Sequence, residues 1–388
     1  MPFLKDVSLS AVVAGFVTVL VGFTSSGVIV FQAAHALGAA THEIASWMWA
    51  LGLGMGFTCI ALSLRYRMPI VTAWSTPGAA MLITSAAGIS LAQATGAFLV
   101  SALMIALAGF SGWFERAMNR IPVSIASGML AGVLLRFGLE LFVVMKAQFI
   151  MAFAMFMAYL IMRRTYPRYA VITAFALGIA IAATQGTLHM ESVSVELARP
   201  VWVMPALSLG ALVGVAVPLF VVTMASQNVP GVAVIRASGY AIPISPVVGW
   251  TGVANFLLAP FGAFAINLAA ITAAICMGRE AHEDPQRRYV ASMSAGFFYL
   301  LIGLFGATVS AVFAAFPHEL VAAIAGLALI GTIGNGLSVA MAAEREREAA
   351  LLTFLVTASG VTLLGIGSAF WGLVAGGVTL GILRTRAT

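Results

Sequence analysis

Hydroxyl and amide side chains interrupt the apolar sequence at three places where they could hold a small anion. In residues 69–80, β-branched residues are followed by Ser75 and Thr76, directly before Pro77. Serine and threonine cap helix starts, and proline is favoured at the first helical position. This order predicts a short extended segment and then a half-helix that begins inside a membrane, with Ser75 or Thr76 as its cap.

A second interruption, in residues 259–272, runs extended through Pro260 and Gly262 and reaches Asn267, which is expected to cap the helix that follows. Irregular backbone is tolerated at membrane depth only where protein or a water-filled cavity surrounds it. Two half-helix starts near the midplane would present free N–H groups and positive dipole ends, which bind an anion without any basic side chain. The simpler alternative is two ordinary helices kinked by proline and glycine.

The third interruption lies at the end of a predicted span over residues 204–227. There Ser226, Gln227 and Asn228 follow a long apolar run, and the matching place near the N-terminus holds Ser25 and Ser26. Either these side chains line a substrate cavity, or they form interhelical hydrogen bonds, as polar residues in membranes frequently do.

Titratable residues inside apolar runs are few. Arg136 and Glu140 are four residues apart and therefore share one helix face. Such groups are functional candidates in a membrane, although these two can also simply pair with each other. The five histidines fall at loops or span ends without metal-ligand spacing, and Cys59 and Cys276 lie inside apolar runs. No metal, cofactor or disulfide is therefore predicted.

The composition shows which solvent surrounds these segments. The 388 residues are 62% hydrophobic and only 8% charged, against about 25% charged residues in soluble domains. Most of the chain must therefore face lipid. The net charge of +6 does not indicate nucleic-acid binding, because the basic residues occur singly or in pairs at the ends of apolar runs.

A transmembrane helix needs about 20 apolar residues, and the runs between breaks predict an all-α membrane protein of fourteen spans. The spans are residues 8–34, 43–64, 69–87, 92–112, 121–141, 147–162, 169–186, 204–227, 245–258, 260–277, 289–315, 320–341, 348–365 and 367–383. A count of twelve is the alternative if short spans merge. With fourteen spans and the N-terminus inside, sixteen of the 19 basic residues fall on the cytoplasmic side. This asymmetry predicts that both termini are cytoplasmic.

Weak internal similarity suggests a duplication. Residues 8–13 resemble residues 208–213, and the two irregular segments are third in each half. Seven spans per half would make the halves enter the membrane from opposite faces, which is the inverted repeat common among secondary transporters. Residues 186–200 are the expected connection, exposed on the outside.

Three stretches together resemble the benzoate–proton symporter (BenE) family of bacterial inner-membrane proteins: TAWSTPGAA at 72–80, SQNVPG at 226–231 and NLAAIT at 267–272. The resemblance covers essentially the whole chain and implies a 7+7 inverted repeat, as in the uracil transporter. It implies a core domain of residues 1–112 and 201–316, and a gate domain of residues 113–200 and 317–388. Because members of the wider fold are often dimers, a homodimer is also expected.

The resemblance implies symport of protons and an aromatic carboxylate such as benzoate across the inner membrane. The expected substrate-binding residues are Ser25, Ser26, Ser75, Thr76, Ser226, Gln227, Asn228 and Asn267. Trp74, Phe261 and Phe264 are candidates to pack against the ring. Nucleobase transporters carry acids near the end of the eighth span and at the start of the half-helix in the tenth. The corresponding stretches here read Ser226-Gln227-Asn228 and Ile266-Asn267. The absence of an acid suits an anionic substrate.

Another small anion or a nucleobase is the alternative cargo. An intramembrane enzyme would need paired carboxylates, a histidine cluster or an activated nucleophile at membrane depth, and the sequence shows none. A channel is disfavoured because no charged ring or carbonyl filter motif is visible.

Overall fold

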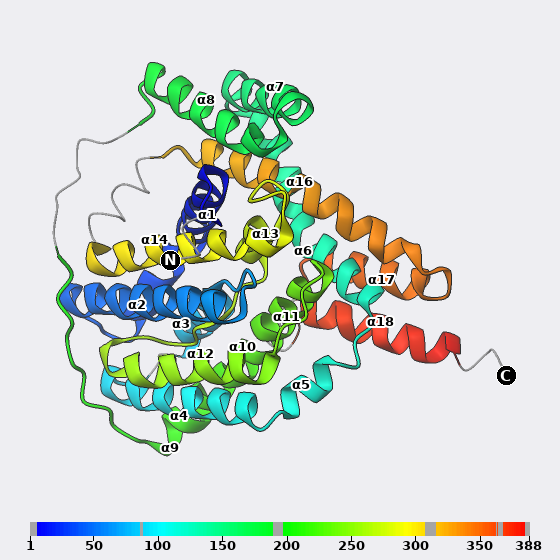
Figure 1. Cartoon of the computed structure of the whole chain (residues 1–388). Coiled ribbons are helices and arrows are strands. Elements are labelled where there is room, and N and C mark those ends of the chain that lie inside the picture. The colour runs from blue at the N-terminus through cyan, green and yellow to red at the C-terminus, as the bar shows by residue number, and fades with distance from the viewer. Residues whose placement is uncertain are drawn as a thin grey trace.

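The computed structural model describes residues 6–85, 88–188, 197–306, 316–361, 363 and 368–384. Within them the regular structure is helical, apart from one pair of very short strands, and irregular segments such as residues 197–208 connect the helices. The helices form two groups (Figure 1). The first group contains α1 (Leu9–Ala36), α2 (Thr41–Tyr66), α3 (Thr76–Ser85), α4 (Leu91–Phe110), α9 (Leu209–Ala211), α10 (Val217–Thr223), α11 (Val229–Ala237), α12 (Ile244–Leu258), α13 (Ile271–Met277) and α14 (Tyr289–Leu304).

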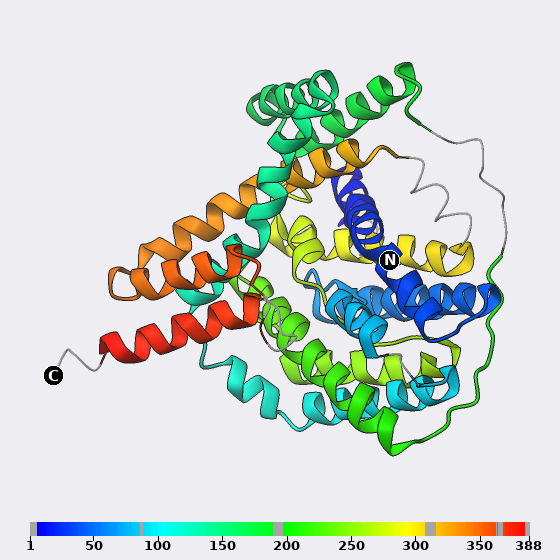
Figure 2. The same ribbon diagram turned by 180° about the vertical axis from the view of Figure 1, so that it is seen from behind.

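The second group contains α6 (Val123–Val143), α7 (Phe149–Thr165), α8 (Ala170–Thr184), α16 (His318–Ala342), α17 (Arg347–Ala358) and α18 (Ser368–Arg384). The short helix α5 (Trp113–Met118) leads from the first group to the second. Seen from behind, α16 to α18 and α6 stand beside the layered helices of the first group (Figure 2). The 3-10 turns are η2 (Val144–Lys146), η3 (Pro167–Tyr169), η7 (Ala259–Phe261), η8 (Pro285–Arg287) and η9 (Glu344–Glu346).

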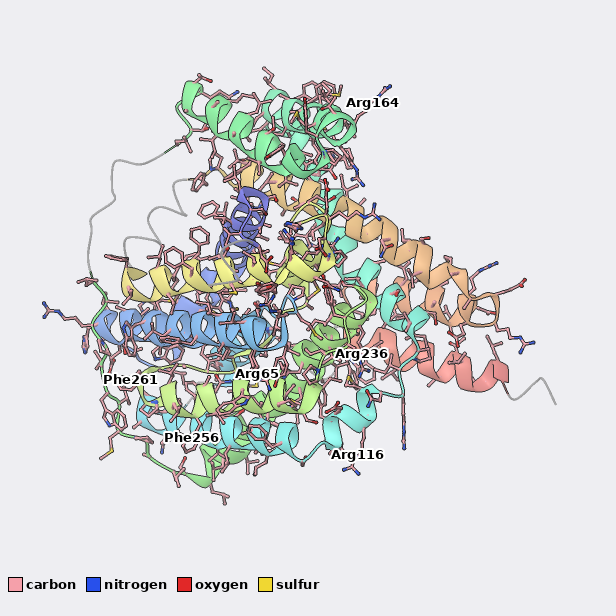
Figure 3. The ribbon with its side chains drawn as sticks, in the orientation of Figure 1. Arg65, Arg116, Arg164, Arg236, Phe256 and Phe261 are labelled. Atoms are coloured by element: carbon pink, nitrogen blue, oxygen red, sulfur yellow. The ribbon has the colours of Figure 1, made fainter. Side chains whose placement is uncertain are left out.

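Several of these helices suit a lipid environment. Among the described residues, six stretches are long and apolar enough to cross a membrane: Thr41–Tyr66, Leu91–Phe110, Val123–Lys146, Leu209–Ala237, Ile244–Phe261 and His318–Ala342. Large apolar side chains such as Leu107 and Ile150 are exposed on the outside of the bundle. Figure 3 shows Arg65 and Arg236 toward the opposite end of the first group from Phe256.

Glycines allow helices of the two sequence halves to pack closely. A Cβ at Gly52 of α2 would lie 2.5 Å from the backbone nitrogen of Gly303 in α14. A Cβ at Gly109 of α4 would lie 2.3 Å from the nitrogen of Gly249 in α12. Contacts between small residues are the usual way in which helices associate in lipid, where burial from water gives no driving force.

The two irregular segments pair with each other at the centre of the first group. Strand β1 (Thr72–Ala73) runs antiparallel to β2 (Asn267–Leu268), with Thr72 opposite Leu268. Each strand precedes a half-helix, α3 or α13, as the sequence predicts. The Oγ of Ser75 accepts a hydrogen bond of 3.0 Å from the nitrogen of Gly78, so Ser75 is the cap of α3.

The prediction that Asn267 caps the second half-helix is wrong. Asn267 is fully buried in β2, and α13 begins four residues later, at Ile271. The reason is the long-range pairing of β2 with β1, which keeps Asn267 extended. Ala270 precedes α13, and no side chain caps it.

The predicted end of the span at residue 227 is also wrong, because the helix continues to Ala237. Two π-helical turns interrupt it, η5 (Leu212–Ala216) and η6 (Met224–Asn228). Each is followed by one residue and then a proline, Pro218 or Pro230. A proline ring clashes with the carbonyl four residues before it, and a wider turn relieves this clash without ending the helix.

Parts of other predictions lie outside the described residues. Four predicted spans, 69–87, 289–315, 348–365 and 367–383, include such residues, as does most of the connection over 186–200.

Candidate functional site

A cavity of about 690 Å³ lies between the two helix groups. Its first wall comes from α1, the β1–α3 segment, the π turn η6, the start of α13 and α14. Its second wall comes from α6, α16, α17 and the start of α18. A volume of this size lies within the range of about 300–1,000 Å³ usual for small-molecule sites.

Four of the eight residues predicted for the site line this cavity: Ser26, Thr76, Ser226 and Gln227. They come from α1, α3 and η6, so segments far apart in the sequence meet here. Ser75, Asn228 and Asn267 are fully buried behind the wall. The side chain of Ser25 lies outside the described parts of the chain.

Two asparagines behind the wall hold strand β2 in place. Asn255 binds both backbone groups of Ile266, with its Nδ2 donating to the oxygen at 2.8 Å and its Oδ1 accepting from the nitrogen at 2.7 Å. The Oδ1 of Asn228 accepts a bond of 3.0 Å from the nitrogen of Leu268. Ser63 does the same for the first segment, because its Oγ bonds both the nitrogen and the oxygen of Ile70. These residues position the half-helices and do not face the cavity.

The two half-helix starts differ in the N–H groups that they leave available. At α3, Pro77 has no N–H, and the N–H of Gly78 is already bound by Ser75. At α13, Ile271 and Thr272 line the cavity, and no side chain caps the first turn. The first amides of a helix have no partner within it. The start of α13 is therefore the better donor of the two, and Thr76 can contribute its hydroxyl from the other side.

Aromatic side chains line the cavity from both walls: Trp74, Tyr299 and, on α6, Phe137. The Nε1 of Trp74 donates a hydrogen bond of 3.0 Å to the Oγ of Ser26, and its ring meets that of Phe23 edge-on at 6.0 Å. Trp74 is one of the three residues that the sequence suggested as contacts for the aromatic ring of a substrate.

Phe261 and Phe264 do not line the cavity, in contrast to the sequence-based suggestion. The ring of Phe264 packs at 5.5 Å from that of Trp47, and the ring of Phe261 packs at 5.4 Å from that of Trp49. Their aromatic contacts hold η7 against α2.

Two charged residues and a histidine also line the cavity: Arg136 and Glu140 from α6, and His318 at the start of α16. Arg136 is exposed and Glu140 half-buried, and in the described part of the chain no ion pair joins them, contrary to the simpler sequence interpretation. Sequence reasoning overlooked Phe137, Tyr299, Thr272 and His318 as cavity residues. The helical spacing of Gly132, Arg136 and Glu140 could have indicated that one face of α6 meets a polar space.

In the described residues no group of three His, Cys, Asp or Glu side chains could hold a metal ion. What the cavity combines is a helix start without a side-chain cap, hydroxyl and amide side chains and aromatic rings. This combination suits a small aromatic anion.

A family model described as benzoate membrane transport protein matches residues 5–382. The chain belongs to this family. It is 48% identical over 374 residues to inner membrane protein YdcO of Escherichia coli (strain K12), with 96% of each chain covered. It is 40% identical over 372 residues to the benzoate membrane transport protein of Acinetobacter baylyi (strain ATCC 33305 / BD413 / ADP1), which covers 96% of this chain and 94% of that one.

Among solved structures, SLC26A9 matches with a TM-score of 0.52 at 13% identity, covering 98% of this chain and 66% of that one. This likeness concerns the fold alone. Family membership makes the chain a multi-pass membrane transporter and not an enzyme.

Proposed function

We propose that this BenE-family chain is a secondary transporter that carries an aromatic carboxylate, benzoate first of all, together with a proton. The observation that carries the proposal is the cavity between the helix groups, with the uncapped start of α13 and the ring of Trp74 on the same wall. The name of the Acinetobacter baylyi relative supports benzoate as the substrate.

The carboxylate binds at the first turn of α13, where the amides of Ile271 and Thr272 point out of the helix. A negative charge there is stabilised by unpaired N–H groups and by the helix dipole, and the low polarity of the surroundings strengthens this attraction. Thr76, Ser26, Ser226 and Gln227 complete the polar surroundings. Ser25 belongs to the same proposed set, whereas Ser75, Asn228 and Asn267 act by shaping the backbone.

The ring of the substrate lies between Trp74 and the apolar side chains of the second group, among them Phe137. Aromatic pairs contribute about 0.5–1.5 kcal/mol beyond the area they bury. A nucleobase is uncharged and rich in hydrogen-bonding groups. The first wall, with Thr76, Ser226 and Gln227, offers no carboxylate to bind its N–H groups, and the carboxylate of Glu140 lies on the second wall.

The proposed architecture is the fourteen-span, 7+7 inverted repeat, with residues 1–112 and 201–316 as core domain and residues 113–200 and 317–388 as gate domain. The matching strand and half-helix pairs in the two halves support it. The protein would sit in a bacterial inner membrane with both termini cytoplasmic, as a homodimer. Transport follows from rocking of one domain against the other around the fixed site.

The experiment is uptake into proteoliposomes of radiolabelled benzoate, uracil or sulfate, with and without an imposed pH gradient. Benzoate alone should accumulate, and collapse of the gradient by a protonophore should abolish the accumulation. Uptake of uracil or sulfate in preference to benzoate would overturn the proposed substrate. Benzoate uptake that ignores the gradient would overturn proton coupling and leave the substrate assignment standing.

A further inference from the structure

A carboxylate from the first helix group reaches into the second group just beyond the far end of α13. Glu280 follows α13 by three residues, and only 12% of its side chain is exposed. Its Oε1 lies 3.9 Å from Nη1 of Arg163 on α7. The same guanidinium donates a hydrogen bond to the hydroxyl of Tyr159 and lies 5.5 Å from the centre of its ring. Glu280, Arg163 and Tyr159 are here called the Glu280 latch.

The approach of Glu280 depends on a glycine in α16. A Cβ at Gly331 would lie 2.8 Å from Oε1 of Glu280, which is closer than real contacts allow. The nearest atom of Arg163 would be 3.6 Å from that same Cβ. A side chain at this position would require the carboxylate of Glu280 or the helix α16 to shift. The latch therefore joins three elements, the end of α13 on one side and α7 and α16 on the other.

The contact between Glu280 and Arg163 is a polar contact in a mostly apolar interface between the two helix groups. This interface is here called the seam. A small hollow beside Glu280 is lined by Val13, Ala14, Val171, Ile172, Ile275 and Ala328, together with Ser10. A partly buried charge is retained at low cost only when partners face it, because desolvation penalises a lone charge. Glu280 thus favours the arrangement in which the seam is closed.

Helix α13 connects the cavity to the latch. Its first residues, Ile271 and Thr272, line the cavity, and its last residue is Met277. Seven helical residues span about 10 Å and move as a unit. A shift of the first turn relative to the second helix group therefore also shifts Glu280 relative to Arg163.

We propose that the Glu280 latch holds the seam between the two helix groups closed in the conformation seen here, and that it must open in each transport cycle. Glu280 and Arg163 are positioning residues for the motion and do not contact the substrate. The proposal rests on the proposed movement of one group against the other. Its test needs no substrate, so it can fail or succeed independently of benzoate transport.

The reporter is Ser10→Cys, because Ser10 is 4% exposed and lines the hollow beside Glu280. A water-soluble maleimide reaches this thiol only when the seam opens, so the labelling rate follows the open fraction. Protein without the Ser10→Cys substitution gives the background labelling rate, which should be low because Cys59 and Cys276 are both fully buried.

Two latch variants are each measured against a matched control. Gly331→Ala is compared with Gly334→Ala in the same helix, where an added Cβ meets nothing within 4 Å. Arg163→Gln is compared with Arg164→Gln on the same helix, where Arg164 is exposed and takes no part in the ion pairs of the described residues. Each latch variant should label about threefold faster than its control, the size expected for one partly exposed ion pair.

Equal labelling rates in both pairs would overturn the latch. Should Gly331→Ala not be recovered as dispersed protein, Arg163→Gln decides alone, since the Arg163 side chain is 45% exposed and the contacts it loses, with Glu280 and Tyr159, are those of the latch.

Discussion

The indole of Trp74 donates a hydrogen bond of 3.0 Å to the hydroxyl of Ser26. Because Trp74 directly follows strand β1, this bond links the end of the strand to helix α1 at the cavity wall. The same hydroxyl donates to the backbone oxygen of Gly22 at 2.9 Å, so Ser26 is held in the orientation that accepts from Trp74. The indole ring is thereby fixed in place before any ligand arrives.

Ser26→Ala should weaken benzoate binding through Trp74. The variant removes a hydrogen bond worth about 1 kcal/mol and leaves the indole N–H without its acceptor, so the Kd should rise about five- to tenfold. Calorimetric titration of the purified protein with benzoate measures this Kd. Ser294→Ala, which removes only a bond to Val290 within α14, is the control and should keep the Kd. Equal affinities in the two variants would mean that the hydrogen bond between Trp74 and Ser26 does not contribute to benzoate binding.

Gly262→Ala should destabilise the fold more than an ordinary glycine replacement. Gly262 has a φ of +103°, and its Cβ would lie 1.9 Å from Cδ1 of Trp47. Backbone strain and overpacking each cost about 1–3 kcal/mol. Gly239→Ala, at a φ of +90° with nothing within 4 Å, isolates the strain. The thermal midpoint in detergent should fall clearly further for Gly262→Ala, and identical midpoints would refute the packing argument.

Asn255→Leu should also lower the thermal midpoint, because it leaves the nitrogen and oxygen of Ile266 buried without partners. Losing two such bonds costs about 2–4 kcal/mol. Asn335→Leu, at an exposed position of α16, should change stability little. A stable Asn255→Leu protein with unchanged affinity would mean that β2 is held without Asn255, by its pairing with β1 and by Asn228.

The sequence indicated the local character of the irregular segments but not how they pair. Pro77 and Ser75 predicted α3 correctly, because caps and prolines act on their immediate neighbours. Asn267 was misplaced because a long-range partner, β1, determines its conformation. The continuation of the helix past Pro230 was missed because π turns relieve the proline clash.

The cavity was predicted only on its first wall. Ser26, Thr76, Ser226 and Gln227 stood out as polar residues in apolar runs. Phe137 and Tyr299 did not stand out, because the sequence cannot distinguish an aromatic residue that faces a cavity from one that faces lipid or a neighbouring helix. Only the packing of the two groups distinguishes these environments.

Arg136→Gln should leave benzoate affinity within about threefold of the parent, since an exposed, solvated guanidinium attracts a carboxylate on the opposite wall of the cavity only weakly. Arg136 belongs to α6 in the second group, whereas the proposed anion site belongs to the first. Titration with benzoate at low and high salt measures the affinity, and Arg116→Gln on α5 is the control. A loss of affinity above tenfold, confined to Arg136→Gln, would assign the carboxylate to a side-chain cation.

The most direct measurement is benzoate binding to Thr272→Asp and Thr272→Asn, at the first turn of α13. Aspartate is favourable to a helix start and keeps the fold, but its charge competes with the substrate at the same amides, whereas asparagine has nearly the same shape without charge. The account predicts that Thr272→Asp raises the Kd at least about tenfold while Thr272→Asn stays within about threefold, because like charges repel strongly where polarity is low. Parent-like affinity in Thr272→Asp would contradict it.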